Sequence, residues 1–400
     1  MKIAFVIQRY GSDILGRSEY HCRLIAERLA ERHEVEVLTT CARDYITWNN
    51  EYPEGTDRVR GVTVRRFANA HPRDIVAFNR YSDWIFNNPH SREDEHSWLE
   101  QQGPWCPQLL DHLERHHQTY DALIFFTYLY APTVLGLQVA PAKSILVPTA
   151  HDEPAIHLGI YRDMFALPAA IAYNTEVERR FLTAEFAIGA VAEETVGCGV
   201  DLPQQSRVRN RADDDASADE DAGPAGGAPA GRWAPAAKGA AFRGRHKIHG
   251  PFALYGGRIE KGKGCEELVE YFSTYHGEGG HLTLALMGVK LMPLPEEPYI
   301  RFAGLLSERE RLQALEAFAV GTPILANARS DVLVDHCLRS NAGLFYADRD
   351  EFVECLKLLA TDDRLRAQMG RNGREYVREN YRWDLIMGKY EKLMGAVRKK

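Results

Sequence analysis

The sequence predicts an α/β protein made of two Rossmann-like, doubly wound domains that face each other across a cleft. Short apolar segments alternate with helical patterns in the first half of the chain, and the alternation resumes after a segment of very different composition. This pattern is typical of parallel sheets covered by helices on both faces. The chain has 400 residues, 45% of them hydrophobic, which is enough for two or three domains with cores of their own.

The first half of the chain carries six predicted strands. They are the apolar runs at residues 3–7, 35–39, 62–67, 122–126, 144–147 and 170–173. Between the first two lies a predicted amphipathic helix, residues 18–33, with Ser18 as its expected N-cap. Residues 122–142 carry no charge, but their polar and proline residues favour a buried strand, a loop and a short buried helix from Pro132 over a membrane span.

The second half repeats the alternation of strands and helices. Predicted strands lie at residues 252–255, 282–287, 300–303, 323–326 and 344–346. Predicted helices lie at residues 265–275, 308–320 and 350–360, and a final helix follows Trp383. Two doubly wound domains bind ligands at the carboxyl ends of their strands, so the loops after these strands are where a site is expected.

Two stretches depart from the alternating pattern. Residues 49–107 are irregular and aromatic, as expected for a ligand-specific surface added to an α/β core. In residues 212–240, 19 of 29 residues are Ala, Gly or Pro, a composition that cannot offset the entropy of ordering. The expected organisation is a first domain, 1–202; a disordered linker, 203–247; a second domain, 248–382; and a final helix, 383–400, that packs back toward the first domain.

Composition and charge exclude several classes of protein. The 49 basic and 56 acidic residues leave a formal net charge of −7, which argues against a nucleic-acid-binding protein that works by bulk electrostatics. The seven cysteines are widely spaced, with no Cys-x-x-Cys pair, so neither a disulfide scaffold nor a zinc ribbon is expected. Met1 and Lys2 lead into an apolar run too short for a secretory signal, so we expect a cytoplasmic protein.

The strongest local motif is the glycine-rich turn that follows residues 252–255. Gly257, Arg258, Lys263 and Gly264 lie between a predicted strand and a predicted helix, an arrangement that aims backbone N–H groups and a helix N-terminus at a phosphate. The turn is a near match to a P-loop, but Gly264 stands where a P-loop has the serine or threonine that binds magnesium. The motif therefore favours phosphate binding with no metal held by the protein. The alternative is an ordinary glycine-rich connection with surface lysines.

Further candidate residues follow other predicted strands. Gly16 lies in a glycine-containing turn after the first strand, beside a helix N-terminus, and His151 follows the strand at 144–147, where it could contact a substrate. Glu308 and Glu316 are eight residues apart, about 80° around a helix, and could share a face. For each of these residues a purely structural role is the alternative.

These motifs, in this order, resemble glycosyltransferase family 4, whose members are retaining enzymes of the GT-B fold. The resemblance rests on the turn near Gly16, on the segment Thr149-Ala-His-Asp, on Gly257-Arg258 with Lys263-Gly264, on residues 315–323 and on the late Tyr-Arg-Trp-Asp segment. It covers most of the chain outside the linker. It implies that the second domain holds a nucleotide-diphosphate sugar and the first domain holds the acceptor.

The resemblance also implies roles for individual residues. Arg258 and Lys263, with Gly257, would hold the donor diphosphate, and Glu316 would accept hydrogen bonds from the ribose. His151 would contact the transferred sugar, Gly16 would allow close approach of the backbone, and Glu308 would be the first glutamate of the family's Glu-x7-Glu pair. The donor is a co-substrate, and no further cofactor or metal is expected.

One departure from the family pattern affects the donor domain. Glu308 and Glu316 meet the expected Glu-x7-Glu spacing, but the context of Glu308 does not match: the strand, its Pro-Ser turn and the first glutamate expected after them are missing. We interpret this as the loss of one βα unit, which should unpair two neighbouring strands and impair catalysis.

The sequence therefore favours a metal-independent, retaining glycosyltransferase of polysaccharide biosynthesis. Its expected partners are a nucleotide sugar donor and a glycan, glycolipid or small-molecule acceptor, with peripheral contact at the inner membrane face if that acceptor is lipid-linked. The alternatives are a degenerate relative that binds nucleotide sugar or glycan with little transfer, and a P-loop nucleotide hydrolase, against which Gly264 counts.

Overall fold

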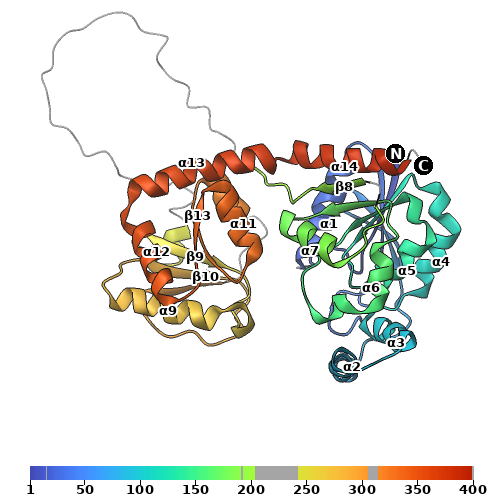
Figure 1. Ribbon diagram of the computed structural model, residues 1–400, viewed down its shortest axis with the longest axis horizontal. Coiled ribbons are helices and arrows are strands. Elements are labelled where there is room, and N and C mark those ends of the chain that lie inside the picture. Colours follow the sequence, from blue (N-terminus) through green and yellow to red (C-terminus); the bar gives the residue numbers. More distant parts are fainter. Residues whose placement is uncertain (15, 191, 203–241, 305–313, 399–400) are drawn as a thin grey trace, which may run out of the picture. The chain divides into compact units, whose positions relative to one another are not determined.

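The computed structural model describes residues 1–14, 16–190, 192–202, 242–304 and 314–398. The chain forms two compact units (Figure 1). The first comprises Met1–Gly199 together with Asn380–Lys400, and the second comprises Val200–Glu379. The predicted linker, 203–247, lies outside the described residues up to residue 241. Its last residues, 242–247, are described and belong to the second unit, where the Phe242 and Phe252 rings lie 6.1 Å apart.

The first unit is built on one eight-stranded sheet. Its strands are β1 (Lys2–Val6), β2 (Glu34–Thr40), β3 (Gly55–Val59), β4 (Val62–Phe67), β5 (Ala122–Phe126), β6 (Ser144–Val147), β7 (Ala170–Tyr173) and β8 (Ala192–Thr195). They lie in the order β3-β4-β2-β1-β5-β6-β7-β8. All neighbours are parallel except β3, which forms an antiparallel hairpin with β4. The chain thus winds outward in both directions from β1 and β5, the doubly wound topology that the sequence predicts.

Helices cover both faces of this sheet, and the alternation of side chains along each strand explains how. Along β5, Ala122, Ile124 and Phe126 belong to one core, whereas Leu123 and Phe125 belong to the other. The first core is covered by α1 (Arg17–Leu29) and α14 (Trp383–Arg398). The second is covered by α2 (Ile75–Asn87), α3 (Arg92–Gln102), α4 (Pro107–His116), α5 (Ala131–Val139), α6 (Gly159–Phe165) and α7 (Glu176–Glu185).

The uncharged stretch at 122–142 forms the buried strand β5 and the buried helix α5, as predicted. Within the ranges given above, no helix combines the length and apolar character needed to cross a membrane.

The stretch at 49–107 is more regular than expected. It contains the β3–β4 hairpin and two helices, α2 and α3, which pack together at one end of the first unit (Figure 1). Asp74 and Ser91 are the N-caps of these two helices. Such residues indicate the start of a helix, but the aromatic composition of the stretch obscured this signal.

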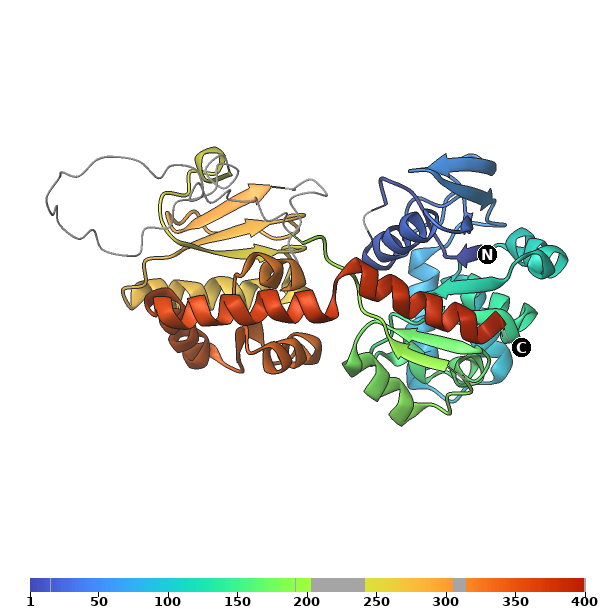
Figure 2. The same ribbon diagram turned by 90° about the horizontal axis from the view of Figure 1, so that it is seen from above.

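Helix α14 completes the first unit although it lies almost 400 residues from β1 in the sequence. It packs beside α1 and over β6, β7 and β8 (Figure 2). Gly199 allows the close approach, because a Cβ there would lie 2.4 Å from Trp383. The Arg28 guanidinium lies 3.6 Å from the centre of the Trp383 ring, a cation–π contact that anchors the start of α14 to α1.

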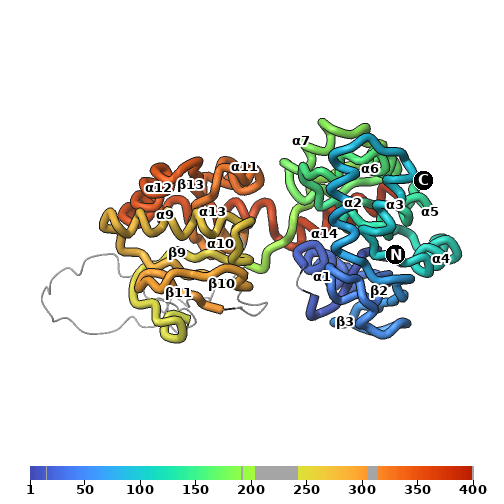
Figure 3. Tube along the Cα trace, turned by 90° about the horizontal axis from the view of Figure 1, so that it is seen from below, coloured from blue at the N-terminus to red at the C-terminus, as the bar shows by residue number. Residues whose placement is uncertain are grey.

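The second unit has a smaller and divided set of strands. They are β9 (Phe252–Gly256), β10 (Thr283–Met287), β11 (Ile300–Gly304), β12 (Ile324–Asn327) and β13 (Gly343–Tyr346). Helices α9 (Cys265–Gly277), α10 (Ala314–Val320), α11 (Asp331–Ser340), α12 (Arg349–Thr361) and α13 (Asp363–Asn380) accompany them (Figure 3). Among the described residues, β9 pairs only with β10 and β12 only with β13, so the parallel strands form a three-stranded and a two-stranded sheet.

The buried face of α14 should contribute strongly to the stability of the first unit. Ile386 is fully buried, whereas its neighbour Leu385 is 39% exposed. We expect Ile386→Ala to lower the free energy of unfolding by about 2–5 kcal/mol, because it leaves a cavity in the core. Leu385→Ala is the matched control and should change it by less than about 1 kcal/mol. Urea denaturation followed by tryptophan fluorescence measures both; equal effects would show that α14 is not part of this core.

Buried His21 should make the first unit sensitive to acid. Burial lowers the pKa of His21 from 6.5 to about 4, since its ring lies in the core against Phe126. The folded protein thus binds fewer protons at His21 than the unfolded chain, so this contribution to stability is lost as the pH falls from 6.5 to 4. The free energy of unfolding of the wild-type protein should fall between pH 6.5 and 4, and we expect His21→Gln to reduce that fall by about 3 kcal/mol. Denaturation midpoints across this range test it, with exposed His96→Gln as the control; parallel curves for His21→Gln and the wild-type protein would contradict it.

Candidate functional site

The first candidate region lies where the winding of the first sheet reverses. The loops after β1 and β5 diverge there, and such a point opens a crevice at the carboxyl ends of the strands. The loop after β1 carries Arg9 and Gly16, and the loop after β5 carries Tyr130. The next loop along the sheet, after β6, carries His151. The structure therefore brings Gly16 and His151, two residues predicted from the sequence, to the same edge of the first sheet.

A buried ion pair organises the loop after β1. Arg9 and Glu19 are only 8% and 5% exposed, and their Nε and Oε1 atoms lie 3.0 Å apart. Gln8 also donates to Glu19 Oε1, at 3.1 Å, and Arg9 Nη1 donates to the Arg43 carbonyl at 2.8 Å. Removing one partner of such a pair leaves an uncompensated buried charge, so the pair holds the loop in one conformation.

Gly16 has a structural reason to be glycine. It is the N-cap of α1, and a Cβ there would lie 1.8 Å from Glu19 Oε2. The predicted N-cap, Ser18, is wrong by two residues: Ser18 lies within the first turn of α1 and donates to Glu19 at 3.0 Å. At position 16 only glycine leaves space for the buried carboxylate of Glu19.

His151 is exposed in the loop after β6. Its side chain is 72% exposed, and Nε2 lies 3.8 Å from Glu153 Oε2. Glu153 also accepts a hydrogen bond from the Tyr128 hydroxyl. His151 is thus exposed to solvent, with Glu153 beside its ring. The neighbouring Asp152 instead lies 2.8 Å from His157 Nε2.

A buried carboxylate fixes the backbone just before His151. Glu178 accepts the Ala150 amide at 2.6 Å and the Asn174 amide at 2.5 Å. Burial raises the pKa of Glu178 to about 7, although these hydrogen bonds oppose the shift. Glu178 was not found from the sequence, where it looks like any carboxylate in the first turn of a helix.

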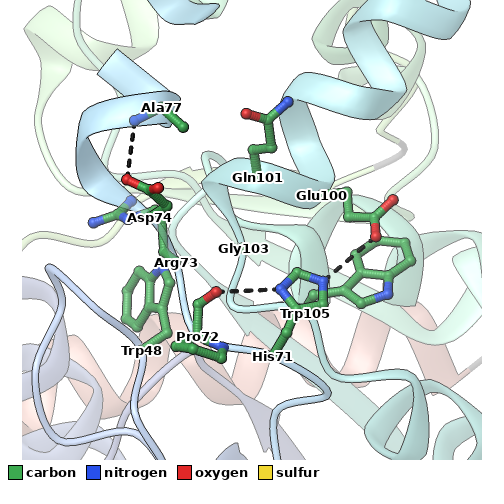
Figure 4. Close-up of a pocket in the computed structure, with 10 residues that line it drawn as sticks. All are labelled: Trp48, His71, Pro72, Arg73, Asp74, Ala77, Glu100, Gln101, Gly103 and Trp105. Atoms are coloured by element: carbon green, nitrogen blue, oxygen red, sulfur yellow. Dashed lines mark hydrogen bonds and ion pairs between the residues drawn. The ribbon is translucent and has the colours of Figure 1, made fainter. Parts of the chain in front are cut away.

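A cavity of about 210 Å³ opens at the same edge of the first sheet (Figure 4). Its walls come from the segments after β2 and β4 and from the connection between α3 and α4. The lining residues are Trp48, His71, Pro72, Arg73, Asp74, Ala77, Glu100, Gln101, Gly103 and Trp105. The Trp48 ring also contacts Tyr130 edge to face at 5.4 Å, which connects the cavity wall to the loop after β5.

The second candidate region is the glycine-rich turn after β9. Gly257 donates its amide to the Met287 carbonyl at 2.9 Å, so this N–H serves the sheet and is not directed at a ligand. Gly288 packs against it, since a Cβ there would lie 1.8 Å from the Gly257 carbonyl oxygen. Gly264 is the N-cap of α9 with φ of 70°, a left-handed conformation that serine or threonine seldom adopts. The backbone conformation of Gly264, like its lack of a hydroxyl group, therefore argues against a P-loop.

The cations of this turn are exposed around the N-terminus of α9. The Arg258 side chain is 51% exposed, with Nη2 3.3 Å from Glu260 Oε1. Lys263 is exposed at the end of a 3₁₀ turn, Lys261–Lys263, directly before Gly264. Lys261 pairs with Glu266 at 2.7 Å. The turn thus gathers three cations at the positive end of a helix dipole, a favourable environment for an anion.

Of the two glutamates in the predicted pair, the structure describes Glu316 but not Glu308. Glu316 lies in the first turn of α10, and its side chain is half-buried. Glu308 lies outside the described residues. A carboxylate that the sequence did not single out, Glu267 on α9, accepts hydrogen bonds from Asn327 at 2.9 Å and Arg329 at 2.8 Å. Glu267 therefore ties the start of α9 to the end of β12.

Comparisons with known proteins agree with this architecture. A family model described as glycosyl transferase-like matches residues 307–392. No curated protein sequence gives a significant match. Sucrose-phosphate synthase from Thermosynechococcus elongatus is a similar solved structure, with 16% identity, a TM-score of 0.63 and 99% of each chain covered.

Two further structures are similar over nearly their whole length. Anabaena HepE in complex with UDP has 12% identity, a TM-score of 0.62 and 100% of each chain covered. The α,α-trehalose 6-phosphate synthase of Burkholderia multivorans has 10% identity and a TM-score of 0.65, with 100% of this chain and 99% of that chain covered. At these identities the likeness establishes the fold: the chain has the two-unit α/β architecture of GT-B glycosyltransferases, as the sequence predicts.

Proposed function

We propose that the protein is a glycosyltransferase that moves a sugar from a nucleoside-diphosphate donor to a glycan, glycolipid or small-molecule acceptor. The observation that carries this proposal is the turn after β9, where Arg258 and Lys263 lie at the N-terminus of α9 within a GT-B fold. The structures of HepE with UDP and with UDP-glucose support a nucleotide sugar as the donor.

The chemistry of sugar transfer suits these residue types. The bond between the anomeric carbon and the diphosphate oxygen breaks, leaving positive charge on the sugar and negative charge on the leaving group. Arg258 and Lys263 stabilise the departing diphosphate, and the dipole of α9 adds to their effect. Gly257 presents no side chain, which lets the diphosphate approach the backbone.

The remaining candidate residues act on the sugars in this proposal. Glu316 accepts hydrogen bonds from the ribose hydroxyls, as the family resemblance implies. His151, held by the Glu178-bound loop, contacts the transferred sugar, and Gly16 allows close approach beside α1. Glu308 keeps the role of the first glutamate of the pair. The acceptor hydroxyl oxygen bonds to the anomeric carbon from the face that the leaving group vacates, and its proton passes to the departing diphosphate oxygen, so the anomeric configuration is retained.

The same turn supports metal independence. Arg258, Lys263 and the N-terminus of α9 supply positive charge of the kind that a divalent ion would bring to a diphosphate, although Arg258 also lies 3.3 Å from Glu260. Gly264 provides no hydroxyl ligand, and its left-handed backbone disfavours one.

A second candidate function is a degenerate relative that binds a nucleotide sugar or glycan with little transfer. The two separate sheets of the second unit favour it, because among the described residues one edge of β9 and one edge of β12 have no partner strand, as the loss of one strand would leave them. The loop after β9 would then lack lateral support, and positioning of a reacting group within about 1 Å is needed for catalysis.

Loss of either cation should weaken binding of the donor. We expect Arg258→Ala and Lys263→Ala each to reduce the affinity for UDP by about 1.5–3 kcal/mol, the usual size of a charged hydrogen bond. Isothermal titration calorimetry with UDP, GDP and ADP in EDTA measures the affinity and the metal independence together. Lys392→Ala is a control that removes an exposed lysine of the first unit, outside the turn. Unchanged affinity in both variants, or binding that requires magnesium, would contradict the proposal.

One edge of β9 has no partner strand among the described residues, and this should be visible in hydrogen exchange. Amides of β9 that face away from β10 should exchange faster than amides of β5, which is paired with β1 and β6 on its two sides. Hydrogen–deuterium exchange with peptide-level mass spectrometry, normalised for intrinsic rates, compares the two strands. Equal protection would show that β9 is covered on both edges and would remove the basis of the degenerate alternative.

A further inference from the structure

The cavity of the first unit has a size and a position that suit a small ligand. It lies beyond the carboxyl ends of β2 and β4, the edge at which doubly wound sheets bind ligands. Its volume of about 210 Å³ has room for a single sugar ring but not for a nucleotide. Figure 4 shows Trp48 and Trp105 at its two sides, with Pro72 and His71 between them.

Arg73 forms part of the cavity wall, and its N–H groups are bound to protein oxygens, so it is not free to bind an anion. Its guanidinium donates to the carbonyls of Tyr45, Ile46 (2.8 Å) and Gln102 (3.2 Å) and to the Gln102 side chain (2.8 Å). It also lies between aromatic rings, 5.1 Å from the centre of Trp48. Burial lowers the pKa of Arg73, as expected for a cation surrounded by protein. These partners occupy most of its five N–H donors.

The groups that remain available to a ligand include two carboxylates and an aromatic ring, alongside the polar side chains of His71 and Gln101. Asp74 caps α2, with Oδ1 accepting the amides of Val76 and Ala77 at 3.0 Å each. Glu100 is 48% exposed and lies 3.4 Å from His71 Nε2. Trp105 is half-buried and packs against the core, so its indole is held rigidly at the rim.

This combination matches the chemistry of an uncharged sugar. Carboxylate oxygens accept hydrogen bonds from neighbouring hydroxyls, and such charge-assisted bonds are stronger than neutral ones. An indole offers a flat apolar surface to the C–H face of a pyranose ring. Asp74 and Glu100 repel an anionic sugar, because the positive charge of Arg73 is already engaged by protein oxygens.

We propose that this cavity binds an uncharged pyranose residue, with Asp74 and Glu100 accepting hydrogen bonds from its hydroxyls and Trp105 contacting its ring. That this residue belongs to the acceptor rests on the proposed function. The sugar-binding site itself does not, since it depends on the first unit alone.

Binding of simple glycosides tests the proposal directly. Saturation-transfer NMR on the full chain would use methyl glucoside, methyl galactoside, methyl mannoside and, as the anionic comparison, methyl glucuronide. We expect saturable millimolar binding of at least one neutral glycoside and none of the glucuronide. Glu100→Gln and Asp74→Asn should each weaken binding about tenfold or more, as expected for loss of a charged hydrogen bond. Asparagine also caps helices well, so the second variant retains the start of α2.

The controls separate this proposal from the proposed function. Glu93→Gln removes an exposed carboxylate from α3 and should leave glycoside affinity unchanged. UDP affinity should be the same in all variants. The proposal is overturned if no neutral glycoside binds, if the glucuronide binds equally well, or if neither Glu100→Gln nor Asp74→Asn alters affinity. Glycoside binding without any nucleotide binding would support the cavity and count against the transferase.

Discussion

A parallel sheet is stable only when both of its faces are covered, and in this protein that constraint determines how the chain is connected. The crossovers between consecutive strands cover one face of the first sheet with α2 to α7. On the other face α1 is joined by α14, which begins at Trp383, after the whole of the second unit. The apolar residues Ile386, Tyr390, Leu393 and Met394 are as deeply buried as any in the strands. The second unit is therefore, in sequence, an insertion between parts of the first.

The first candidate region uses the same architecture to position polar groups. Arg9 and Glu19 meet at the point where the winding of the sheet reverses, and Gly16 is small because Glu19 needs the space. Glu178 holds the backbone ahead of His151 from a helix on the opposite core. Buried charged groups contribute little to net stability, but they impose one geometry on the loops that carry them. The exposed His151 thus follows a backbone segment that a buried carboxylate holds in place.

Features that depend on residues adjacent in the chain could be predicted from the sequence, whereas contacts that form only on folding could not. The strands β5, β6 and β7 were predicted to the residue, because they are apolar runs with polar or proline residues at their ends. The glycine-rich turn was found because its residues are adjacent in the chain. By contrast, Arg9 with Glu19 and Ala150 with Glu178 are pairs formed by folding, and nothing local marks them. Helices α2 and α3 were missed because aromatic side chains hid the caps Asp74 and Ser91.

The position of α14 near the end of the chain also affects when the first unit can fold during translation. A ribosome that has completed β8 must add roughly 200 further residues before α14 emerges, which takes about 10–40 s at ~5–20 residues per second. Throughout that interval the apolar face beside α1, including Ile124 and Phe126, lacks its second covering helix. The core of the first unit therefore cannot be completed until translation is nearly over.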